Sequence, residues 1–191
     1  MTLSERLRQP VDVAGLAAFR ILFGLLMLFG SVRFLFSGWI HDFYVAPDYF
    51  FHFWAAPWVT VLPPWAMYAA MVALAVFSAL IALGLFYRVA VWGFFLIFTW
   101  VELIDVTNYL NHYYLVSLLS LLLAVLPANA AFSLDARWRP AIRRSTVPRW
   151  IYALLRTQVG VVYVFAALAK FNTDWLIHGQ PLNIWLSART D

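Results

Sequence analysis

Residues 151–175 read IYALLRTQVGVVYVFAALAKFNTDW, and this stretch is long and apolar enough to cross a lipid bilayer. Near its far end lies Lys170, the only lysine among thirteen Lys and Arg residues. On a helix, Tyr163 lies one heptad before Lys170, so the two side chains fall close to one face. The alanines around Lys170 are small enough to let neighbouring helices approach closely. A lysine amine held there can be stripped of water and can work as a base.

A simpler interpretation of Lys170 is also open. A lysine near the end of a membrane helix often extends its ammonium group to the membrane surface and has no chemical role. Taken alone, residues 151–175 favour this structural interpretation, so the rest of the chain has to decide between the two.

The composition excludes a soluble globular domain, because 64% of the residues are hydrophobic and only 12% are charged. The net charge of +4 does not indicate nucleic-acid binding, since the arginines gather in the connections between apolar runs. That distribution is typical of orientation signals or contact with anionic lipid. The sequence has no cysteine, which excludes disulfides and thiolate metal sites. It also has no spacing that indicates a catalytic metal, a serine nucleophile or a phosphate-binding loop.

Five apolar runs predict an all-α integral membrane protein with about five transmembrane helices. The predicted spans follow a cytoplasmic arm of residues 1–14, and they cover about residues 15–36, 66–86, 89–107, 113–126 and 151–171. The run at 113–126 is short for a crossing. Residues 37–65 are rich in aromatics, interrupted by prolines and free of Lys and Arg. They predict an extended outer loop at the membrane interface.

Basic and non-basic connections alternate along the chain. Arginines occur in the arm, in the turn at Arg88 and five times in residues 127–150, whereas the tail contains only Arg189. By the positive-inside rule, the N-terminus is expected in the cytoplasm and the C-terminus outside. The preference for arginine over lysine is typical of a GC-rich bacterium, so we expect the bacterial inner membrane.

This topology places five ionisable groups from four helices near the outer membrane surface: Arg33, Glu102, Asp105, His112 and Lys170. Glu102 and Asp105 are three residues apart and are expected to share a helical face with Tyr109. Ionisable groups are costly inside a membrane, so the cluster indicates either a site or a structural ion-pair network. In the site interpretation, Arg33 pairs with an acid and Lys170 stays available. A flat, lipid-soluble substrate such as a quinone would suit an apolar, aromatic cavity there.

Three motifs, in order and at similar spacing, resemble the vitamin K-dependent gamma-carboxylase family, whose shared membrane part is the HTTM domain. They are DVTNYLNHYYL (Asp105–Leu115), PANAAFSLD (Pro127–Asp135) and VYVFAALAKFNTDW (Val162–Trp175). The resemblance covers most of residues 13–187. It implies that Lys170 is the catalytic base and that His112 assists the quinone chemistry. The expected quinone pocket is lined by Arg33, Glu102, Asp105, Asn111 and Tyr163.

The resemblance implies a membrane carboxylase or epoxidase that couples hydroquinone oxygenation to glutamate carboxylation. Its co-substrates would be a reduced vitamin K or menaquinol-type hydroquinone with O2 and CO2, without a metal. In such a reaction the hydroquinone, deprotonated by an amine and combined with O2, supplies the base that removes a glutamate γ-proton, and CO2 is captured. The expected partners are membrane lipid, the quinone and a protein that carries the glutamates, and no nucleic acid.

The chain departs from the family pattern at three positions. Val106 replaces a residue that is commonly basic, Ala130 replaces an arginine, and Ala167 replaces a glycine. The relatives also continue into further membrane segments and a soluble outer domain. We therefore expect an N-terminal portion or a truncated reading frame, and both an active and an inactive chain stay open at this point.

Two other functions remain open at this stage. A non-catalytic quinone-binding or assembly subunit of the DoxX kind would keep the cavity without a competent lysine. A transporter is the third interpretation, and the broken helices and duplicated halves that it requires are not visible in the sequence.

Overall fold

The structure is a computed structural model that describes residues 1–188. Arg189, counted above with the tail, lies outside the described residues. The chain divides into two compact units, residues 1–152 and the residues from Ala153 onward, and each is described by itself.

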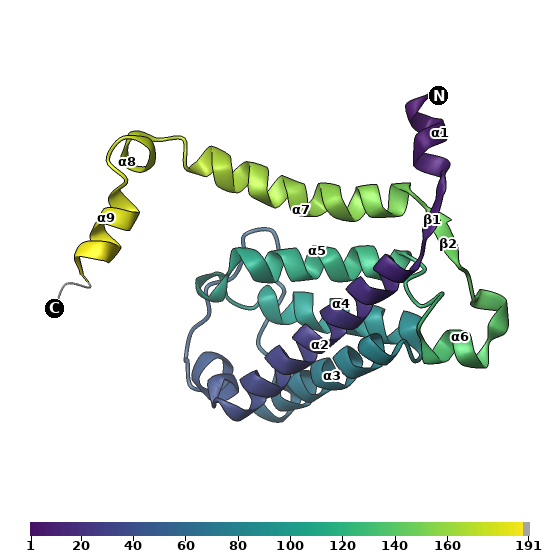
Figure 1. Cartoon of the computed structure of the whole chain (residues 1–191). Coiled ribbons are helices and arrows are strands. Elements are labelled where there is room, and N and C mark those ends of the chain that lie inside the picture. Colours follow the sequence, from purple (N-terminus) through teal and green to yellow (C-terminus); the bar gives the residue numbers. More distant parts are fainter. Residues whose placement is uncertain (189–191) are drawn as a thin grey trace. The chain divides into compact units, whose positions relative to one another are not determined.

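The first unit contains most of the secondary structure (Figure 1). Its helices are α1 (Leu3–Arg8), α2 (Ala14–Phe36), α3 (Pro64–Leu83), α4 (Tyr87–Glu102), α5 (Asn111–Val125) and α6 (Leu134–Trp138). Its strands are β1 (Pro10–Asp12) and β2 (Thr146–Pro148), and its short helical turns are His41–Val45, Val106–Asn108 and Pro140–Ile142. Helix α7 (Trp150–Ala169) leads into the second unit, which contains α8 (Thr173–Leu176) and α9 (Gln180–Ser187).

The structure confirms a mainly helical protein with membrane-length helices. Helices α2, α3 and α7 are each long and apolar enough to cross a bilayer. Helix α4 has 16 residues and α5 has 15, which correspond to roughly 24 and 22 Å at about 1.5 Å per residue. Five helices therefore occur close to the five predicted places, and three of them reach the length of a full crossing.

Helices α2 to α5 form the core of the first unit, in which α2 packs on α3, α3 on α4 and α4 on α5 (Figure 1). Gly24 lies at a close approach of α2 to α3, because a Cβ there would lie 2.5 Å from the backbone nitrogen of Ala82. Small residues allow this kind of contact between membrane helices. Helix α3 begins with Pro64 in its first turn and ends at Leu83, and the next residue, Gly84, caps it with a φ of 63° that suits glycine.

A short antiparallel pairing joins β1 to β2, with Val11 opposite Val147. The hydroxyl of Tyr152 donates to the carbonyl of Asp12 at 2.7 Å and accepts from the amide of Leu16 at 2.8 Å. These contacts hold the start of α2 against residues that are far away in sequence. The sequence does not predict this pairing, since two strands of three residues leave no periodic signal.

Candidate functional site

Glu102, the last residue of α4, makes an incompletely satisfied polar contact inside the helix bundle. Its Oε2 accepts a hydrogen bond from the Ser117 hydroxyl of α5 at 2.7 Å, and that hydroxyl lies 3.3 Å from the Thr99 hydroxyl. The other carboxyl oxygen, Oε1, is buried and has no hydrogen-bond partner within residues 1–188. Buried polar atoms are nearly always paired, so Oε1 marks a place where a ligand group could bond.

Asp105 is also buried, with 6% of its surface exposed, but it belongs to a turn and not to α4. Its Oδ1 accepts from both the amide and the hydroxyl of Thr107, at 2.9 and 2.8 Å. The expectation that Glu102, Asp105 and Tyr109 share one helical face is therefore wrong. Helix α4 ends at Glu102, because Asp105 takes an extended conformation and caps the next turn.

Tyr44 brings the aromatic segment close to both acids. It is buried in the short turn after α2. Burial raises the pKa of Tyr44 above its ordinary value, and ionised Tyr113, Asp105 and Glu102 raise this pKa further. The amide of Val106 also donates to the carbonyl of Phe51 at 2.8 Å, which attaches the segment to the turn after Asp105. The sequence alone does not single out Tyr44, because nothing in its pattern distinguishes this tyrosine from the many aromatic residues around it.

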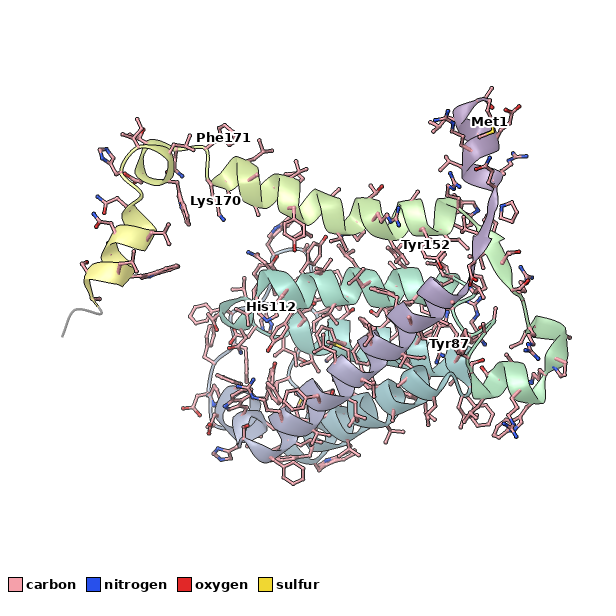
Figure 2. The ribbon with its side chains drawn as sticks, in the orientation of Figure 1. Met1, Tyr87, His112, Tyr152, Lys170 and Phe171 are labelled. Carbon is pink, nitrogen blue, oxygen red and sulfur yellow. The ribbon has the colours of Figure 1, made fainter. Side chains whose placement is uncertain are left out.

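The polar residues at the start of α5 are exposed. Helix α5 begins at Asn111, two residues before the expected start of that span, so Asn111 and His112 belong to its first turn. Asn111 and His112 both lie there on the surface, and the ring of His112 packs edge-on against Tyr113 at 4.6 Å between ring centroids (Figure 2). The imidazole of His112 is therefore exposed in the first turn of α5, where it could contact a ligand.

Arg33 does not pair with the acids as expected. It is exposed near the end of α2, and its guanidinium lies 4.7 Å from the centroid of the Trp39 ring. Within residues 1–188 the single ion pair joins His41 to Asp42. The predicted Arg33–acid network is thus absent from the described residues, because Arg33 stacks on its neighbouring aromatic residue instead.

Lys170 follows the last residue of α7 in the second unit (Figure 2). The side chain of Asn172 donates to the carbonyl of Ala169 at 3.1 Å and accepts from the amide of Trp175 at 3.0 Å. It thus closes α7 and starts α8 at the same time. In this turn the Nζ of Lys170 lies 4.9 Å from the centroid of the Trp175 ring. The KFNTDW segment (residues 170–175) therefore forms a short turn in which the Lys170 amine lies beside an aromatic ring.

The expected burial of Lys170 is not found within the second unit. Lys170 and the alanines before it are exposed, and so is Tyr163, with 72% of its surface accessible. The reason is that α8 and α9 leave these residues uncovered. Lys170 and Tyr163 lie in the second unit, whereas Glu102 and His112 lie in the first. Their convergence at one site therefore stays a prediction.

Arg20 is the buried charge that the sequence analysis did not identify as important. Its side chain, on α2, has 0% exposure. Its guanidinium donates to four backbone carbonyls, those of Ile81, Ala82, Ala128 and Phe132, at 2.6 to 3.1 Å. Two of these carbonyls end α3, where the helix dipole favours a cation. An arginine that interrupts an apolar run was the available signal.

The PANAAFSLD motif also has a structural role in this fold. The carboxylate of Asp135 accepts from the amides of Phe86 and Tyr87 at 2.9 and 3.0 Å, and from the side chain of Asn129 at 3.0 Å. It therefore holds the turn into α4, where Tyr87 lies (Figure 2). Ala130, which replaces an arginine, is buried, and its carbonyl accepts from the amide of Arg144.

Comparison with known proteins identifies the family. No solved structure matches this chain. The model of the HTTM domain matches residues 8–191, which is nearly the whole sequence and includes His112, Lys170 and all three motifs described above. The chain therefore belongs to the HTTM domain family, the domain of the vitamin K-dependent gamma-carboxylases.

Proposed function

We propose that this protein is a membrane carboxylase or epoxidase of the vitamin K-dependent gamma-carboxylase type. The observation that carries the proposal is the HTTM match over residues 8–191, which contains both Lys170 and His112. The hydroquinone, once deprotonated and combined with O2, supplies the base that takes a γ-proton from a peptide glutamate and lets CO2 add there. The residues of this chain hold the quinone and move its first proton.

In this proposal Lys170 accepts the proton of the hydroquinone hydroxyl. Asn172 holds the backbone turn that carries Lys170, and the amine lies beside the ring of Trp175 at the end of α7. A defined position is what a general base needs, because it must come within hydrogen-bond reach of the hydroxyl. His112, exposed at the start of α5, is proposed to assist at the quinone oxygen.

The quinone pocket is proposed to include Glu102, Asp105, Asn111, Tyr163 and Arg33. The unpaired Oε1 of Glu102 supports this proposal, because a quinone or hydroquinone oxygen would complete its hydrogen bonding. The proposed partners are membrane lipid and a protein that carries the glutamates. The proposed location is the bacterial inner membrane, with the N-terminus in the cytoplasm.

The experiment is epoxide formation from menaquinol, measured with the purified protein in lipid nanodiscs under air. Lys170→Ala is expected to abolish epoxide formation. Lys170→Arg is also expected to abolish it, because a guanidinium stays protonated and cannot accept the hydroxyl proton. Arg156→Gln is the matched control, since it removes an exposed cation of α7, the helix that Lys170 follows, and it should leave the rate unchanged. Epoxidation by Lys170→Arg at the parent rate would refute the assignment.

A second candidate is a non-catalytic quinone-binding subunit. The observation that favours it is the Glu102–Ser117 contact, which offers an unpaired oxygen within the first unit without any lysine. This candidate predicts that menaquinone binds to the parent protein and to Lys170→Ala equally, and that neither forms epoxide. Glu102→Leu should weaken menaquinone binding, because it removes the unpaired oxygen, and parent-like binding by this variant would contradict the second candidate.

The orientation has its own test. Because the chain has no cysteine, single cysteines at Phe53 and Arg143 can be labelled in intact cells with an impermeant maleimide. Position 53 should be labelled and position 143 should be protected. The opposite pattern would reverse the proposed topology.

A further inference from the structure

A basic pocket lies in the first unit, beside the first residues of α2. It has a volume of about 630 Å³, and its lining includes Arg137, Arg143 and Arg144. Residues of α6 form part of the wall, and Asp135 of the same helix holds the start of α4. The pocket therefore lies near the start of α4, whereas Glu102 is at the end of that helix.

Backbone hydrogen bonds give the pocket its shape. The amide of Val13 donates to the carbonyl of Ser145, and the amide of Arg144 donates to the carbonyl of Ala130, each at 3.0 Å. The guanidinium of the buried Arg20 donates to the carbonyl of Phe132 at 2.6 Å. The segments that carry the lining arginines are thus attached to α2 and to the loop after α5, so the pocket needs no ligand to form.

The charges of the pocket are not neutralised by the chain. Arg137, Arg143 and Arg144 are exposed, and within residues 1–188 none of them has a carboxylate within 4.0 Å. Asp12 is the single acid among the described lining residues, and its Oδ1 accepts from the amide of Ala14 at 2.6 Å. That bond occupies the amide of the first residue of α2. The three arginines therefore leave an excess of positive charge.

The lining includes Ala14, the first residue of a membrane-length helix, and insertion of that helix across a bilayer would place the pocket at the membrane surface. Phe132, another lining residue, exposes 72% of its surface and offers apolar contact beside the arginines. The phosphate groups of lipids lie at the membrane surface, and one guanidinium group can donate two parallel hydrogen bonds to two oxygens of the same phosphate. We propose that this pocket binds the phosphate group of an anionic phospholipid, with Arg137, Arg143 and Arg144 as its donors.

The test uses the whole protein in dodecyl maltoside micelles doped with either phosphatidylglycerol or phosphatidylcholine, and native mass spectrometry counts the lipids that stay bound. The parent protein should retain phosphatidylglycerol in preference to phosphatidylcholine. An arginine beside an anionic lipid surface changes affinity about fivefold. Arg143→Gln should therefore weaken phosphatidylglycerol binding about fivefold, and the triple variant R137Q/R143Q/R144Q should remove the preference.

The matched control is the triple variant R6Q/R8Q/R139Q, which removes the same charge from exposed arginines outside the pocket lining. It should keep the preference for phosphatidylglycerol. Equal losses in the two triple variants would overturn the proposal, because they would indicate a diffuse charge effect. Displacement of the lipid by equimolar inorganic phosphate would also overturn it, since the occupant would then be a free anion. Tryptophan fluorescence in phosphatidylcholine micelles checks that all variants stay folded.

Discussion

Replacing Arg20 by methionine should be among the most destabilising single changes in this protein. The substitution keeps an apolar stem of similar length and removes four hydrogen bonds to backbone carbonyls. Hydrogen bonds from a charged group contribute about 1.5–3 kcal/mol each, so the gross loss is roughly 6–12 kcal/mol. Removing a buried charge returns several kcal/mol of desolvation cost. The expected net loss in the free energy of unfolding is about 4 kcal/mol.

The assay is unfolding in mixed micelles by titration with sodium dodecyl sulfate, followed by the fluorescence of the ten tryptophans. Arg33→Met is the matched control, because Arg33 lies on the same helix but is exposed and contacts only the Trp39 ring among the interactions described. An exposed cation–π contact contributes about 0.5–1 kcal/mol, which bounds the expected effect. If Arg20→Met and Arg33→Met lose the same stability, the reasoning about the buried guanidinium fails.

Three more predictions follow from the same structure. Gly24→Ala should lower the free energy of unfolding by about 3 kcal/mol, because the added Cβ would lie 2.5 Å from a backbone atom of α3. Gly30→Ala on the same helix places its Cβ where nothing lies within 4 Å, so it should not lower the free energy of unfolding in the same titration. Asp105→Ala should lower the folded yield, measured by size-exclusion chromatography, because it removes two hydrogen bonds of a buried carboxylate. Asp48→Ala, at an exposed position, should keep the yield of the parent protein, and equal losses in the two variants would contradict this reasoning. The raised pKa of Tyr44 means that the folded state holds its proton more tightly, so its stability contribution is complete below about pH 10 and is lost as the pH rises further. Tyr44→Phe should therefore resist alkaline unfolding better than the parent, and identical pH curves would contradict the assignment.

The apolar pattern predicted the positions of the helices closely, because a helix that crosses a bilayer requires a long run of apolar residues, and such runs can be seen directly in the sequence. The first span was expected at about 15–36 and is found at Ala14–Phe36. The end of α4 was misplaced by several residues, since the helix stops at Glu102 and Asp105 caps the next turn. A local capping choice of this kind leaves no trace in hydropathy.

The candidate site was predicted less completely, because its contacts depend on tertiary structure. Glu102 was selected as an ionisable group, but its pairing with Ser117 could not be foreseen from spacing alone. The burial of Arg20 could not be predicted, because its partners are backbone carbonyls. Every residue has such a carbonyl, so no sequence pattern indicates which of them bond to the guanidinium. The placement of Lys170 relative to Glu102 stays a prediction, because the two residues belong to different units.

The contacts around the start of α2 have a consequence for the order of events during synthesis. Tyr152 bonds to Asp12 and Leu16 across 140 and 136 positions of sequence, and Arg20 reaches Ala128 across 108. Helix α2 is therefore made long before the ribosome has made several of the groups that bond to it. Until residues 128–152 emerge, the arginine has to stay hydrated or be shielded by the insertion machinery. We expect assembly of this bundle to finish with a late closing step, in which the beginning of the chain waits for the loop after α5.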